Sequence, residues 1–259
     1  MLKLHNFSSR CTMIISVERS GSRFVSFVAV FTAMIAVLDS IPILPAFYSG
    51  VWGSWMFLLS PLVGILLGPY VGAVSVGLGN LVGHILYFRD ITEFLFMLGA
   101  PLGAAMAGFV YQRNWKPVIG LYSVLLLGYF LIDPIARELP LWGIWDILVG
   151  YGFVLIFVLL VTQDFWPKSQ ERSSLLGLLL GSVIGLEADI LLRVFILVPG
   201  QTYWFLFGWT VEVLQTIWLG AGFITPLKVA MSAIVTVVLG RSIIRALTTE
   251  SIDMETGSG

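Results

Sequence analysis

The stretch from Trp55 to Phe88 limits the possible folds of this chain more than any other segment. It reads WMFLLSPLVGILLGPYVGAVSVGLGNLVGHILYF. One helical span takes about 20 apolar residues, so the stretch is long enough to cross a bilayer twice. Gly68-Pro69 interrupts it once, and its only strongly polar side chains, Asn80 and His84, lie near one end. The stretch therefore predicts two closely packed membrane helices joined by a tight turn, with a polar site at one end.

The composition extends this prediction to the whole chain. Hydrophobic residues make up 58% of the 259 residues and charged residues 11%, whereas a soluble domain carries about 25% charged residues. The net charge of −1 gives no electrostatic argument for nucleic acid as a partner. Cys11 is the only cysteine, so the sequence contains no pair for an internal disulfide and no cysteine-based metal cluster. We expect no metal and no other cofactor.

Apolar runs of helical length follow one another from Phe24 to Leu247. They predict an all-α integral membrane protein, a compact bundle of six to eight transmembrane helices in a single domain over residues 24–247. The predicted runs are 24–45, 54–67, 69–88, 92–111, 117–132, 143–165, 174–197, 203–219 and 223–247.

Positively charged residues predict the orientation, because cytoplasmic loops hold more Lys and Arg. A basic tail, residues 1–23, precedes the first run, and basic residues recur at 113–116, at 163–172 and at the end of the last run. This pattern places both termini in the cytoplasm after eight crossings if 203–219 is re-entrant or interfacial on the outer side. If 203–219 crosses fully, then 54–67 or 117–132 does not. Residues 248–259 are small and acidic and predict a disordered tail.

Small residues recur at fourfold spacing on several runs, where they allow helix backbones to approach closely in lipid. The simplest interpretation of these small residues is packing between helices inside the bundle. Ala29 and Ala33 differ, because they lie on the first run, whose small face can meet either its own bundle or a partner subunit. The internal series are Gly64, Gly68 and Gly72; Gly99, Gly103 and Ala107; and Gly177, Gly181 and Gly185.

Ionisable and polar residues concentrate in the predicted outer half of the bundle. A proton relay should extend through the whole membrane, whereas a solute pocket open to one side should gather polar groups there. Asp189 and Arg193 are four residues apart and can simply pair with each other, but Arg193 and Lys228 together can hold a carboxylate or phosphate. Glu187 lies nearer the middle of its run. The outer-half residues are Asp39, Asn80, His84, Asp146, Asp189, Arg193 and Lys228.

Aromatic residues gather at the same predicted face. Trp52 lies in the charge-free loop after the first run, and Trp204 lies near the end of the chain. Such residues commonly form an interfacial belt, or they can stack on a flat solute ring. The predicted substrate-binding residues are Asn80, His84, Asp146, Asp189, Arg193, Lys228, Trp52 and Trp204.

Motifs of catalysis are missing from the sequence. It contains no GxxxxGK[ST] phosphate loop, no GxSxG and no HExxH. An enzyme is therefore the weaker interpretation, and any ATP hydrolysis must come from partner subunits.

Three segments resemble the substrate-binding S components of energy-coupling factor (ECF) importers. Pro61 to Val74 carries Gly-Pro-x-x-Gly, Ala29-Val-Phe-Thr-Ala33 carries Ala-x-x-x-Ala, and residues 226–247 resemble the last helix with its basic end. The resemblance implies capture of a vitamin or similar micronutrient from the outer side of the cell membrane. It also implies a membrane coupling subunit, lying against Ala29 and Ala33, and two cytoplasmic ATPases. Residues 45–53 would form a lid over the substrate. That family has six spans, whereas this chain has about eight apolar runs. The difference falls mainly within residues 113–220.

The leading hypothesis is therefore a substrate-capture subunit of an ATP-driven importer. The alternatives are a self-sufficient secondary transporter or channel, and a membrane enzyme or assembly factor that acts on a lipid. The sequence does not identify the solute.

Overall fold

The computed structural model describes residues 21–41, 53–88 and 93–256, and the regular elements of these residues are helices. Six segments are long and apolar enough to cross a membrane: Pro69–Leu86, Glu93–Tyr111, Trp115–Ile132, Leu141–Thr162, Gln170–Leu197 and Val211–Ala246. The fold is thus the predicted all-α bundle of a multi-pass membrane protein. In chain order the elements are α1 (Gly21–Asp39), η1 (Trp55–Leu58), α2 (Ser60–Leu67), α3 (Pro69–Leu86), α4 (Glu93–Phe96), α5 (Gly99–Tyr111), α6 (Trp115–Ile132), α7 (Ile135–Glu138), η2 (Leu141–Ile144), α8 (Trp145–Thr162), α9 (Gln170–Leu197), α10 (Thr202–Phe205) and α11 (Val211–Thr256).

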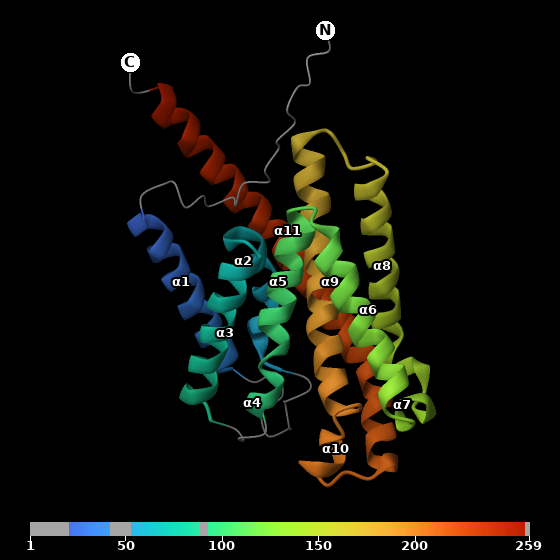
Figure 1. The fold of residues 1–259 in the computed structure, drawn as a ribbon. Helices are drawn as coiled ribbons and strands as arrows, with labels where there is room; N and C mark the ends of the chain where they lie inside the picture. The colour runs from blue at the N-terminus through green and yellow to red at the C-terminus, as the bar shows by residue number, and fades with distance from the viewer. Residues whose placement is uncertain (1–20, 42–52, 89–92, 257–259) are drawn as a thin grey trace.

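Successive long helices run in alternate directions (Figure 1). α1 begins at the end of the bundle where α11 finishes. The opposite end, where α1, α3 and α9 finish and α4, α7 and α10 lie, is called the α10 end below. The two ends of the described chain therefore lie on the same side of the bundle.

The outer faces of the helices are apolar, as expected of surfaces in contact with lipid. On α3 the exposed residues recur at intervals of four, while small and polar residues of the same helix are buried. A soluble protein rarely exposes so large an apolar surface. The exposed residues of α3 include Tyr70, Val74, Leu78 and Val82.

The most buried spanning helix is α9, which packs most extensively against α5 and also against α11, α8, α6 and α2. Glycines allow the close approach of α5 and α9. A Cβ atom on Gly103 would lie 2.6 Å from the Gly185 carbonyl oxygen, and one on Gly185 would lie 2.7 Å from the Gly103 carbonyl oxygen. No larger residue fits either position without moving a backbone, so the predicted internal packing of these small residues is confirmed.

The predicted turn at Gly68-Pro69 is also confirmed. α2 ends at Leu67 and α3 begins at Pro69, with Gly68 between them at a φ of +84°. Glycine adopts this backbone conformation without a steric penalty, and proline at the first helical position preorganises α3. A Cβ on Gly72 would lie 2.6 Å from the Cα of Gly64, so the two helices pack backbone against backbone after the turn.

The prediction that 203–219 is one re-entrant or interfacial segment is wrong for residues 211–219, whereas 203–210 lie outside the spanning helix. Residues 211–219 are the first part of α11, which continues as one helix through Pro226. Proline removes the donor to the carbonyl four residues earlier, here that of Gly222, and the indole N–H of Trp145 donates to this carbonyl at 2.8 Å. Because the orphaned acceptor is satisfied, the helix does not end there.

Two smaller predictions also differ from the structure. Trp218 lies in the segment 203–219 that was predicted to be re-entrant or interfacial, but it is 1% exposed and its ring is stacked on Tyr129. The last helix extends to Thr256, whereas a disordered tail was expected from residue 248. Residues 248–256 contain no glycine or proline, and Glu250, Met254 and Glu255 among them favour helix. The predicted basic tail falls on residues 1–23, of which 1–20 lie outside the described part of the chain.

Candidate functional site

Two basic side chains from different helices meet inside the bundle toward the α10 end. Arg193, near the end of α9, is 7% exposed, and Lys228 of α11 is 6% exposed. A Cβ built on Gly53 would lie 3.7 Å from Nη1 of Arg193 and 3.8 Å from Nζ of Lys228. Both cations therefore lie against the backbone of one residue in the segment that leads from α1 to η1.

Two neighbours hold these cations in place. Asp189 accepts a hydrogen bond from Nε of Arg193 at 2.6 Å, which confirms the predicted pairing of these two residues. Nζ of Lys228 lies 5.2 Å from the ring centroid of Phe57, a favourable cation–π position. The Lys228 side chain is buried and does not extend to the surface of the bundle. We call Asp189, Arg193 and Lys228 the cationic cluster.

A glycine of α5 closes the other side of the ion pair. A Cβ on Gly99 would lie 2.1 Å from Oδ1 of Asp189 and 3.0 Å from Nε of Arg193. Only glycine leaves room for both side chains at this point. The same glycine series that packs α5 on α9 therefore also makes space for the cationic cluster.

A second polar group, the histidine cluster, consists of Asp39, Ser54, Asn80, His84 and Glu93. Nδ1 of His84 lies 2.6 Å from Oδ2 of Asp39 and 3.0 Å from the carbonyl oxygen of Asn80. Two acceptors facing one ring nitrogen assign the hydrogen to Nδ1. Nε2 then faces Glu93, whose Oε2 is 4.0 Å away. Ser54 donates to Oδ1 of Asp39 at 2.5 Å.

Asn80 contributes an unused acceptor to the histidine cluster. Its amide nitrogen donates to the Met97 carbonyl at 3.0 Å, while its Oδ1 is buried and has no hydrogen-bond partner. Such a buried, unsatisfied amide oxygen is unfavourable without a ligand or water.

Gly53 and Ser54 join the two clusters, since one contacts the cations and the next donates to Asp39. Gly53 has a φ of +73°, a conformation that favours glycine. The segment entering η1 thus lies between the histidine cluster and the cationic cluster. Residues 42–52, including the predicted site residue Trp52, lie outside the described residues.

Two other predicted site residues lie elsewhere. Asp146, at the start of α8, contributes instead to a separate buried group with Glu187 of α9 and Tyr122 of α6. Trp204 is 66% exposed on the short helix α10. An exposed tryptophan at the end of a membrane bundle fits the interfacial interpretation, so we no longer include Trp204 in the candidate site.

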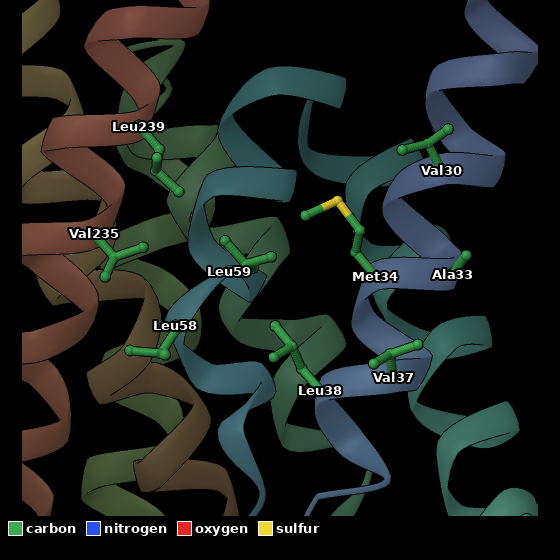
Figure 2. A pocket seen from close by; sticks show the side chains of 9 residues that line it. All are labelled: Val30, Ala33, Met34, Val37, Leu38, Leu58, Leu59, Val235 and Leu239. Carbon is green, nitrogen blue, oxygen red and sulfur yellow. The ribbon is translucent and has the colours of Figure 1, made fainter.

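Ala29 and Ala33 lie on an exposed part of α1. Beside them is an apolar groove with a volume of about 640 Å³ between α1, the η1–α2 segment and α11. Figure 2 shows Met34 of α1 extending toward Leu59, with Val235 of α11 on the far wall. The groove contains almost no polar surface, so it is suited to a lipid chain or an apolar helix rather than to a polar solute.

Sequence reasoning missed several members of the site. Glu93 stands at the start of an apolar run and reads as a solvated helix end, yet it is 3% exposed. Ser54 and Gly53 carry no sequence signal beyond their position after the first run. Nothing in the sequence distinguishes Phe57 from the many other aromatic residues of the chain. Their roles depend on where η1 enters the bundle, which the sequence pattern does not give.

The chemistry of the cationic cluster suits the binding of a small anion. In the histidine cluster the Ser54 hydroxyl donates to Asp39. Among the described residues, no group of three or more His, Cys, Asp or Glu side chains is placed to hold a metal ion. Two buried cations, one aspartate and an aromatic ring instead form surroundings that attract a small anion. No family model matches the chain, and neither a curated protein nor a solved structure matches it.

Proposed function

We propose that this protein is a membrane-embedded capture subunit for a small anionic solute, which works in an ECF-type importer in the cell membrane. The observation that carries the proposal is the convergence of Arg193 and Lys228 on Gly53. As defined, the cationic cluster combines two basic side chains with one carboxylate, that of Asp189, and so has a formal net charge of +1. A carboxylate or phosphate of the solute would balance that charge and accept the guanidinium and ammonium donors.

The position of Gly53 supports a capture role. The resemblance to S components assigns residues 45–53 to a lid over the substrate, and Gly53 is the described residue of that stretch that contacts both cations. A lid connected to the cationic cluster would open and close the pocket and exclude water from it. In this proposal the α10 end faces the outside of the cell.

The exposed positions of Ala29 and Ala33 support a partner subunit. Two small residues one turn apart allow a helix of another chain to approach the α1 backbone closely. In the proposal this partner is the membrane coupling subunit, and two cytoplasmic ATPases attached to it drive uptake.

A second candidate, a self-sufficient secondary transporter, is favoured by the buried carboxylates of Asp146 and Glu187. Ionisable groups inside a membrane bundle commonly serve ion or proton coupling. A secondary transporter would need no ATPase.

Reconstitution distinguishes the two functions. The protein is purified from its native membrane, the copurifying proteins are identified, and the small molecule that copurifies is used for uptake into liposomes. The importer proposal expects a coupling subunit and paired ATPases, and uptake only when all subunits and ATP are present. Uptake by this protein alone, driven by an ion gradient, would refute the importer and support the secondary transporter.

A further inference from the structure

Asp146 and Glu187 form an acidic pair inside the bundle, apart from the cationic cluster. Each is 3% exposed. A Cβ on Gly150 would lie 2.8 Å from Cγ of Glu187 and 2.6 Å from the hydroxyl of Tyr122. Asp146 is one turn before Gly150 on α8, so it lies on the helix face that meets Glu187. The two carboxylates are close enough to repel each other when both are charged.

Within the described chain, three of the four carboxylate oxygens of this acidic pair make no hydrogen bond of good geometry. Both carboxylate oxygens of Asp146 and Oε2 of Glu187 are buried without a hydrogen-bond partner. Unsatisfied buried carboxylate oxygens are rare in native proteins, and each requires a donor or a counterion.

The neighbouring hydroxyls do not supply that donor. Tyr122 donates its proton to the Ile147 carbonyl at 2.8 Å, and Thr225 donates its proton to the Ala221 carbonyl at 2.8 Å. A hydroxyl has one hydrogen, so both oxygens are left as acceptors. Tyr122 and Thr225 face the acidic pair, and the first backbone N–H groups of α8, those of Asp146 and Ile147, lie near the Asp146 carboxylate. No basic side chain lies among these neighbours, so two carboxylates share a site that holds neutral donors and acceptors.

The charged groups on these helices are directed elsewhere. Asp189 and Arg193 pair with each other; Asp189 is two residues from Glu187 and thus about 200° around α9. Lys228 of α11 lies over Phe57. The remaining titratable neighbour, Tyr151 of α8, is stacked on Tyr122 and shares a hydrogen bond with Ser123.

We propose that Asp146 and Glu187 form a proton-binding site that holds at least one proton at neutral pH. The proton comes from solvent and forms an O–H bond with one carboxylate oxygen, which cancels one buried charge. The new O–H then donates to an acceptor that otherwise has no donor: the second carboxylate, the Thr225 oxygen or the Tyr122 oxygen. A metal ion is the weaker occupant, since the described residues provide no third carboxylate or imidazole. This inference does not depend on the identity of the solute.

Infrared spectroscopy of the purified full-length protein tests the proton directly. A buried protonated carboxyl gives a C=O stretching band that shifts to lower frequency in D2O. We expect this band at neutral pH in the wild type and in Glu171→Gln, a control for an exposed glutamate of the same helix. We expect its loss in the double variant Asp146→Asn, Glu187→Gln. A wild type without the band, or a double variant that retains it, would overturn the proposal.

A second measurement remains informative if the double variant folds poorly. The single variant Glu187→Gln mimics a neutral carboxyl, so its fold should be preserved. A folded state that binds a proton released on unfolding loses stability as pH rises. We expect thermal stability to fall with rising pH in the wild type and to depend less on pH in Glu187→Gln. Equal pH profiles of the two proteins would refute the proposal. Loss of the infrared band when sodium chloride replaces choline chloride would also refute it, because sodium would then occupy the site.

Discussion

Replacing Asp189 by Asn should affect stability and solute binding in opposite directions. Asp189 neutralises Arg193 in the free protein, at 2.6 Å from its Nε, and both side chains are more than nine-tenths buried. An anionic solute that binds the guanidinium competes with this internal carboxylate. The variant therefore loses an internal partner of Arg193 and also loses the competitor of the solute.

The structure sets the size of both effects. Asparagine keeps an oxygen that can accept from Nε, so the loss is smaller than the ~3–5 kcal/mol of removing one partner of a buried ion pair. The loss of stability in Asp189→Asn should be at least the difference of about 1 kcal/mol between a charged and a neutral hydrogen bond. We expect the free protein to be destabilised by about 1–3 kcal/mol. If the solute recovers half of that free energy, about 0.5–1.5 kcal/mol, its affinity rises roughly two- to tenfold, since 1.4 kcal/mol is a factor of ten.

The assay combines thermal unfolding in detergent with titration calorimetry, using the small molecule that copurifies with the wild type. Glu171→Gln is the matched control, because Glu171 is an exposed carboxylate at the other end of the same helix, paired with Arg241 and Arg245. It should change stability by less than about 1 kcal/mol and leave affinity unchanged. Weaker solute binding in Asp189→Asn would refute the idea that Asp189 and the solute compete for Arg193.

Three further predictions concern packing and assembly. Gly103→Leu should prevent folding because its side chain would meet the α9 backbone, whereas Gly120→Leu, which has open space around its Cβ position, should fold normally by size-exclusion chromatography. Trp145→Phe should lower folding stability by about 1 kcal/mol, because the Gly222 carbonyl freed by Pro226 loses its donor. In Pro226→Ala the helix itself supplies an N–H to this carbonyl. If Trp145→Phe destabilises that variant equally, the reasoning is wrong. Ala33→Trp should abolish ATP-driven uptake and leave solute binding intact, and a loss of binding would place this face inside the bundle.

The sequence predicts much of the fold because its signals are local. Gly68-Pro69 specifies a turn through backbone geometry, and Gly103 and Gly185 specify close packing through their lack of side chains. The error at 203–219 has a non-local cause. Whether a helix continues past Pro226 depends on a donor for the freed carbonyl, and that donor, Trp145, is distant in the sequence.

The sequence predicts how deep each residue of the candidate site lies in the bundle. It does not predict which way the side chain points. Arg193, Lys228 and Asp146 were all assigned to the same half of the bundle from their positions along the helices. Depth does not tell which way a side chain points around its helix. The rotation of α8 turns Asp146 toward Glu187, while the packing of α11 on η1 brings Lys228 to Gly53. These rotations follow from the packing of distant helices, so the sequence pattern alone does not contain them.

Native mass spectrometry of the wild type and of Arg193→Gln, Lys228→Gln tests the central claim most directly. Glutamine is shorter than either side chain, but it keeps a polar hydrogen-bonding end and removes both charges. We predict that the wild type releases one small anionic molecule and that the folded double variant carries none. Equal occupancy in the two proteins, or a bound molecule without an acidic group, would contradict the assignment of Arg193 and Lys228 as the anion-binding residues.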